Sequence, residues 1–136
     1  MRKGFTLVEL SLAIFIIALI GVAALTGLNH YRQKAELRFQ QDVIEEYLLF
    51  AKQQAVTMQR DIDVLFFENG FTVQSSRGTL KELTLARPFT VSSLRLGFNA
   101  DGNPRFAGTL YLYRRGQTVA KMTVAVGSGL ITWSAQ

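Results

Sequence analysis

The 136-residue sequence contains no cysteine and a single histidine, His30. The lack of cysteine excludes disulfides, thiolate metal sites and a cysteine nucleophile. No partner for catalysis is evident near His30, which is interpreted as a solvated residue, and no phosphate-binding loop occurs. The sequence therefore offers no catalytic constellation and predicts a protein that is not an enzyme and needs no cofactor.

Charge and proline are both scarce near the start of the chain. The 24 residues Phe5–Leu28 carry one charge, Glu9, and neither of the two prolines lies in this segment. At 1.5 Å per residue a helix of this length is roughly 36 Å long, which is enough to cross a hydrocarbon core of about 30 Å. Two of the four preceding residues, Arg2 and Lys3, are basic.

Three interpretations of this apolar segment compete. A plain transmembrane anchor would keep the N-terminus in the cytoplasm, because basic residues stay on that side, and would place the C-terminal part outside. A secretory signal peptide would use the small residues Val22-Ala23-Ala24 and release a chain starting at Leu25. The length of the apolar run and the early carboxylate of Glu9 argue against a signal peptide.

The third interpretation depends on the heptapeptide Lys3-Gly4-Phe5-Thr6-Leu7-Val8-Glu9 and the apolar run after it. This arrangement resembles the prepilin processing site of type IV pilins and type II secretion pseudopilins. The resemblance implies that prepilin peptidase removes the leader 1–4 by cutting between Gly4 and Phe5, and that it methylates the new amino group of Phe5. It also implies that segment 5–28 is kept, first as a membrane anchor and then as the packed core of a helical filament.

The carboxylate of Glu9 fits this resemblance on physical grounds. A carboxylate inside a membrane helix costs about 2.5–3.5 kcal/mol on insertion scales unless it has a partner. Cleavage would create an ammonium group at Phe5, one helical turn before Glu9, and the helix dipole also favours a negative charge there. The ammonium belongs to the same chain or, as the family favours, to a neighbouring subunit; alternatively, Glu9 snorkels to the cytoplasmic interface. We expect Glu9 to be required for assembly.

Helical spacing continues beyond the apolar segment, so that one helix is predicted over Phe5–Met58, roughly 80 Å long. Segment 29–60 is its amphipathic continuation, and the stripe expected to cover a sheet consists of Leu28, Ala35, Phe39, Val43, Tyr47, Ala51, Ala55 and Met58, with Ile44 and Leu48 alongside. Many major pilins have a proline where this chain has Thr26 and Gly27, and this departure favours a minor subunit.

From residue 61 the period changes from helical to alternating, which is typical of strands. Turn residues separate the apolar runs, with Asn69-Gly70 and Arg115-Gly116 as expected hairpin turns. The expected strands are Ile62–Phe67, Phe71–Gln74, Thr79–Ala86, Leu94–Phe98, Thr109–Tyr113, Thr118–Val126 and Leu130–Trp133. The predicted fold class is α+β, a type IV pilin-like fold in which one long N-terminal helix packs on an antiparallel sheet domain at 61–136.

The C-terminal half adds a finer resemblance. It is carried by Phe98-Asn-Ala-Asp-Gly-Asn103, Gly108-Thr-Leu-Tyr-Leu112, Lys121-Met-Thr-Val-Ala-Val126 and Gly127-Ser-Gly129. These segments resemble the H-type minor pseudopilin of type II secretion and its FimT/FimU-like minor pilin relatives. One residue departs from the pattern, because Leu130 stands where several relatives have a basic residue.

Two acidic pairs offer oxygen ligands that calcium would accept. Asp101 and Asn103 are interpreted as a turn, and Asp61 and Asp63 as a solvated strand start, since no acidic loop of calcium-site length accompanies either pair. No metal site is therefore predicted.

DNA is a more serious candidate partner. From Arg60 onward the chain has nine lysines and arginines against five acids, a net charge of +4. Arg114 and Arg115, next to Tyr111 and Tyr113, would be able to grip phosphates and stack bases. An ordinary solvated turn explains the same residues, and it is the favoured interpretation.

These observations predict a minor pilin or pseudopilin, a structural subunit at the tip of a type II secretion pseudopilus or a type IV pilus. The expected partners are other pilins, the prepilin peptidase and an inner-membrane assembly platform. The expected location is the inner membrane, with the N-terminus cytoplasmic and the C-terminal domain extracytoplasmic, and then a periplasmic or surface filament. Two alternatives remain: a minor pilin acting in DNA uptake during natural transformation, and a membrane-anchored binding module.

Overall fold

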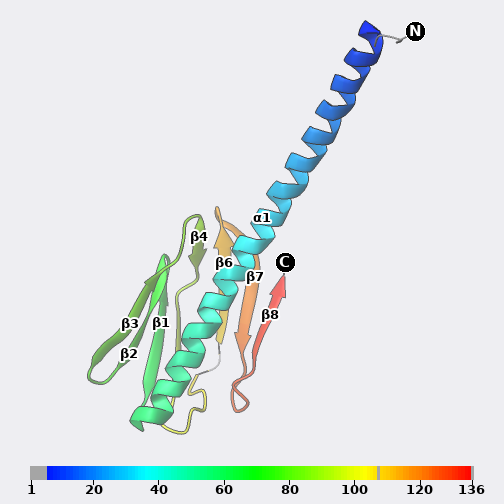
Figure 1. Ribbon diagram of the computed structural model, residues 1–136. Helices are drawn as coiled ribbons and strands as arrows, with labels where there is room; N and C mark the ends of the chain where they lie inside the picture. The colour runs from blue at the N-terminus through cyan, green and yellow to red at the C-terminus, as the bar shows by residue number, and fades with distance from the viewer. Residues whose placement is uncertain (1–5, 107, 136) are drawn as a thin grey trace. The chain divides into compact units, whose positions relative to one another are not determined.

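The computed structural model describes residues 6–106 and 108–135, and the chain divides into two units, Met1–Arg38 and Phe39–Gln136. The helix α1 (Leu7–Met58) belongs to both units (Figure 1). In the first unit the described residues from Leu7 onward are all helical. The second unit contains the rest of α1 and eight strands.

Both ends of α1 are closed by local hydrogen bonds. At the start, the Oγ1 of Thr6 accepts from the backbone N–H of Glu9 at 3.3 Å. At the end, Gln59 adopts a left-handed φ of 49°, and its N–H donates to the carbonyl of Val56 at 3.3 Å. The N–H of Arg60 donates to the carbonyl of Ala55 at 3.1 Å. These two bonds form a Schellman motif, which satisfies carbonyl groups that a helix end leaves unpaired.

The strands form two four-stranded antiparallel sheets where we expected one. The first sheet has the order β3-β2-β1-β5 and the second the order β4-β6-β7-β8. The bounds in the first sheet are β1 (Ile62–Phe67), β2 (Gly70–Ser75), β3 (Gly78–Thr84) and β5 (Leu94–Phe98). Those in the second are β4 (Phe89–Val91), β6 (Gly108–Arg114), β7 (Gln117–Val124) and β8 (Ile131–Ala135).

The split between the sheets occurs around the short strand β4, which the sequence did not predict. The Arg87-Pro88 peptide bond is cis, and the three residues of β4 pair with β6. The chain then leaves the second sheet at Ser92, whose hydroxyl accepts from the N–H of Tyr111 at 3.0 Å, and enters the first sheet as β5. A strand of three residues is too short to produce an alternating pattern.

The core of the second unit lies between α1 and the two sheets, and Figure 1 shows this part of α1 lying across them. The buried face of the helix is the row Gln40, Ile44, Leu48, Ala51 and Ala55. The expected stripe was partly wrong, because Phe39 and Met58 are 61% and 41% exposed. Ile44, Leu48, Ala51 and Ala55 were in the expected stripe, whereas the polar Gln40 was not.

The two expected hairpins form, although one turn is shifted by a residue. Arg115 (φ 52°) and Gly116 (φ 80°) make a two-residue turn between β6 and β7, as predicted. Between β1 and β2 the loop is Glu68-Asn69, because Gly70 already pairs with Phe67. Gly70 is needed for another reason: a Cβ there would collide with the carbonyl oxygen of Leu83 on β3.

Candidate functional site

The apolar part of α1 is the candidate assembly surface. Its described side chains between Leu7 and Leu28 are all exposed, with Leu7 at 85% and Ile17 at 69%. α1 is the one helix in the described part of the chain that is long and apolar enough to cross a membrane. An exposed apolar surface of this length is typical of a segment that lipid or other helices cover.

Glu9 and Thr6 close the N-terminal end of this surface. The Oε2 of Glu9 accepts hydrogen bonds from the N–H and from the hydroxyl of Thr6, both at 3.0 Å. With the reverse bond from the N–H of Glu9 to Thr6, this is a capping box, in which two backbone donors are satisfied reciprocally. This role was not predicted from the sequence, although the spacing Thr-x-x-Glu is the pattern that predicts it.

The capping box changes the physical account of Glu9. Its carboxylate already has partners within its own chain, so an ammonium group is not needed merely to make it tolerable near the membrane. The two bonds from Thr6 both reach Oε2. The expected cleavage site between Gly4 and Phe5 lies outside the described residues.

Asp61 precedes β1 and is exposed, as expected of a strand start, whereas Asp63 is half-buried, and both carboxylates are paired with arginines. Oδ2 of Asp63 lies 2.7 Å from Nη2 of Arg95, and Oδ2 of Asp61 lies 2.9 Å from Nη1 of Arg105. The guanidinium carbons of both arginines lie near the ring of Phe106, at 5.6 and 5.3 Å from its centroid. The four charges therefore form a compact neutral cluster and do not present a basic surface.

The turn at residues 99–104 is organised by Asn99. Its side-chain oxygen accepts from the N–H groups of Asp101 and Asn103 at 3.1 and 2.8 Å. Its backbone oxygen accepts from the N–H of Gly102 at 2.8 Å. In the described residues, no group of three or more histidine, aspartate or glutamate side chains is placed to hold a metal ion.

Arg114 and Arg115 lie at the β6–β7 turn. The guanidinium carbon of Arg114 lies 5.5 Å from the centroid of the Phe89 ring, and Arg115 is exposed. Tyr111 and Tyr113 are half-buried and alternate with the buried Leu110 and Leu112, so they lie on the side of β6 that faces away from the core. The arrangement leaves Arg115 as the more accessible cation of the two.

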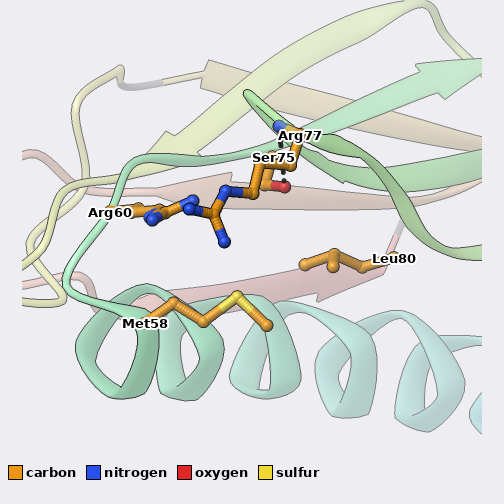
Figure 2. Close-up of a pocket in the computed structure, with 5 residues that line it drawn as sticks. All are labelled: Met58, Arg60, Ser75, Arg77 and Leu80. Carbon is orange, nitrogen blue, oxygen red and sulfur yellow. Dashed lines mark hydrogen bonds between the residues drawn. The ribbon is translucent and has the colours of Figure 1, made fainter.

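Two other arginines meet at a pocket that the sequence analysis did not identify. The pocket is lined by Met58, Arg60, Ser75, Arg77 and Leu80 and has a volume of about 290 Å³ (Figure 2). The end of α1 and the β2–β3 hairpin bring these residues together. Seventeen positions separate the two arginines, so no local sequence pattern reveals the site.

The comparisons with known proteins agree with this geometry. Residues 1–25 match the family model described as "Prokaryotic N-terminal methylation motif". The solved structure of the type IV minor pilin FimU from Pseudomonas aeruginosa (strain PAO1) superposes with a TM-score of 0.61 at 17% identity. The superposition covers 76% of this chain and 92% of the FimU chain, and it shows that the two proteins share a fold.

The motif, the long helix and the antiparallel sheets are those of a type IV pilin-like protein. Among curated proteins, it is 26% identical over 134 residues to "Competence protein ComGD" of Bacillus subtilis (strain 168). That match covers 96% of this chain and 92% of ComGD.

Proposed function

We propose that this chain is a minor subunit of a pilin-type filament that serves competence, the capacity to take up DNA. The observation that carries the proposal is the exposed apolar length of α1 in a chain related over nearly its whole length to a competence protein. The proposed subunit is cut between Gly4 and Phe5 and methylated at Phe5. It waits in the inner membrane with its N-terminus cytoplasmic and its C-terminal domain extracytoplasmic.

Assembly follows from the exposed helix. When the helix leaves the bilayer, its apolar surface would be exposed to water unless neighbouring helices replace the lipid. This exposure costs a free energy of about 25 cal/mol per Å². Prepilin peptidase, an inner-membrane assembly platform and sister pilins are the partners that such a route requires. Glu9 would pair with the ammonium group of a neighbouring subunit, while Thr6 holds its carboxylate in place from within the chain.

A type II secretion pseudopilus and a type IV pilus use the same fold, so the fold does not choose between these filaments and a competence filament. The likeness to FimU concerns the fold alone, since only 17% of the aligned residues are identical. The relation to ComGD covers both chains almost completely and favours competence. The lack of a proline in Phe5–Met58 fits a minor subunit, and the proposed position is the tip, where minor subunits start assembly.

Mass spectrometry of the mature protein tests the processing. We expect a chain that starts at Phe5 and carries one additional methyl group. A start at Leu25 would show a secreted domain, and a retained Met1 would show a simple membrane anchor. Either of these two results contradicts the proposal.

Deletion of the gene in its own host separates the filament types. We expect the frequency of natural transformation to fall by orders of magnitude, while the amounts of secreted enzymes and of surface pili stay unchanged. Plasmid-borne wild-type protein should restore transformation. Normal transformation together with a secretion defect would assign the chain to a secretion pseudopilus instead.

A further inference from the structure

The pocket at the end of α1 gathers two positive charges over an apolar floor. Figure 2 shows the guanidinium groups of Arg60 and Arg77 turned into the same space, with Met58 and Leu80 below them. Arg60 comes from the segment after the helix, and Arg77 comes from the turn between β2 and β3. Two like charges directed into one hollow repel each other, and an anion between them would remove that repulsion.

No acidic side chain in the described residues neutralises these two arginines through an ion pair. The ion pairs of this part of the molecule join Asp61 and Asp63 to Arg95 and Arg105. Asp61 follows Arg60 in the chain, yet its carboxylate lies 2.9 Å from Arg105. The acids nearest to Arg60 in the sequence are thus engaged elsewhere, and the positive charge of the pocket remains available to a ligand.

Hydrogen bonds hold the backbone of the segments that carry both arginines. The N–H of Arg60 is bonded to the carbonyl of Ala55 in the Schellman motif at the end of α1. The N–H of Arg77 donates to the hydroxyl of Ser75 at 3.3 Å, and the same hydroxyl donates to the carbonyl of Gly78 at 3.4 Å. Because these segments are ordered before any ligand binds, less conformational entropy is lost on binding.

The chemistry of the pocket selects a phosphate group that carries an organic substituent. Guanidinium groups present paired N–H donors in a planar fork that matches the oxygens of a phosphate. The volume of about 290 Å³ is at the lower end of the range for ligand pockets, so it accommodates little more than one phosphate and part of its substituent. Met58, 41% exposed and flexible, and Leu80 provide apolar contact for a sugar or a base.

We propose that Arg60 and Arg77 bind one phosphodiester group of single-stranded DNA. The inference depends on the proposed role in competence, which supplies the polymer, and on the net charge of +4 from Arg60 onward, which attracts it. The neutral cluster of Asp61, Asp63, Arg95 and Arg105 does not compete for the ligand. The pocket therefore provides one defined contact within a broader, weaker electrostatic attraction.

Fluorescence anisotropy with the full chain in detergent micelles tests the proposal. The probe is a labelled single-stranded oligonucleotide, titrated at several salt concentrations. For the double variant Arg60→Gln/Arg77→Gln we expect the slope of log K against log salt to become shallower by about 0.7, the value for one phosphate contact on a single strand. At 0.1 M salt this change corresponds to about fivefold weaker binding.

Two further variants make the result specific. Arg60→Lys/Arg77→Lys keeps both charges but removes the planar fork, and we expect binding between that of the wild type and that of the glutamine variant. Arg87→Gln/Arg115→Asn removes two exposed charges elsewhere, with asparagine tolerated at the left-handed position 115. This control variant lowers only the general positive charge, so its slope should lie closer to that of the wild type than the slope of the glutamine variant does.

Three outcomes would overturn the inference. They are the absence of salt-dependent DNA binding by the wild type, an equal loss in the control variant, and an unchanged wild-type slope in the glutamine variant. If the glutamine variant kept the wild-type slope but were excluded from filaments, the pocket would instead hold a carboxylate of a neighbouring subunit. The proposed function is tested separately, since the glutamine variant should still be cut at Gly4–Phe5 and enter filaments while transformation falls.

Discussion

Glu9 is assigned two roles, capping of α1 and pairing with an ammonium group, and the substitution Glu9→Gln separates them. Glutamine at position 9 keeps a carbonyl oxygen that accepts from Thr6 but removes the charge that would pair with an ammonium group. We expect Glu9→Gln and Glu9→Ala to insert into the membrane normally and both to be lost from sheared filaments. Quantitative immunoblotting of the filament fraction measures the effect.

Thr6→Val is the matched variant for the capping task, because it keeps the shape of the side chain and removes the hydroxyl. We expect filament incorporation to fall only partly, since an N-cap contributes about 0.5–2 kcal/mol. If Glu9→Gln assembled like the wild type while Thr6→Val did not, capping would be the role of Glu9 and the pairing hypothesis would be wrong.

Gln59 has a backbone conformation that lowers the stability of the fold. Its φ of 49° places a side chain in the left-handed region, at a cost of about 1–2 kcal/mol for a residue with a Cβ. Glycine would remove this cost and would stabilise the unfolded chain by only about 0.4–1 kcal/mol. We therefore expect Gln59→Gly to raise the free energy of unfolding by up to about 1 kcal/mol in chemical denaturation.

Gln59→Ala is the control for this prediction. Alanine keeps the Cβ, and with it the strain, and loses only the exposed hydrogen bond from Nε2 of Gln59 to the carbonyl of Val56 at 2.9 Å. Its unfolding free energy should lie at or slightly below that of the wild type. A gain in stability equal to that of the glycine variant would show that the left-handed conformation is not the cause.

At the scale of the elements, Leu48 and Leu49 provide a matched pair on α1. Leu48 is fully buried against the sheets, whereas its neighbour Leu49 is 60% exposed. Leu48→Ala should lower the free energy of unfolding by about 2–5 kcal/mol, because it removes apolar contacts and leaves a cavity. Leu49→Ala should change it by no more than about 0.5 kcal/mol.

Denaturant titration followed by circular dichroism compares the two alanine variants. Equal losses would mean that the helix is rotated about its axis relative to the buried row Gln40, Ile44, Leu48, Ala51 and Ala55. The Leu49→Ala variant also tests filament assembly. If Leu49 contacts a neighbouring subunit, Leu49→Ala would reduce assembly without reducing the stability of the isolated chain.

The secondary structure was largely predictable because its periods are local. The helix over Phe5–Met58 and seven of the eight strands follow from apolar spacing and turn residues, with their ends shifted by up to a few positions. The separation into two sheets was not predictable, since it depends on the three-residue strand β4 and on its pairing with β6, far along the chain. Four of the five buried residues on α1 belong to the predicted stripe, and the fifth, Gln40, was missed because it is polar.

The candidate sites also differ in whether the sequence reveals them. The heptapeptide that ends at Glu9 is contiguous, so the sequence reveals it, and the family model matches the same region. The pocket of Arg60 and Arg77 requires the end of the helix and a hairpin turn to meet, which only the folded chain shows. The pairings of Asp61 with Arg105 and of Asp63 with Arg95 were hidden for the same reason, and they engage two of the cations counted toward DNA binding.

At the scale of the whole molecule, the apolar segment and the C-terminal domain should be energetically independent. The described side chains from Leu7 to Leu28 are exposed, so they bury no surface that would stabilise the domain. A chain that starts at Asn29 should therefore be soluble, monomeric and folded, with the denaturation midpoint of the full chain in detergent. It should also be absent from filaments, because the surface that replaces lipid has been removed.

Leu48→Ala introduced into this shortened chain provides the internal control. The loss of about 2–5 kcal/mol should equal the loss in the full chain, because additivity holds for sites that share no contacts. Analytical ultracentrifugation checks the monomer, and the denaturant slope checks that the same surface is exposed on unfolding. A shortened chain that unfolds at a much lower midpoint would mean that residues before Asn29 support the core, and the two roles assigned to the helix could not then be separated.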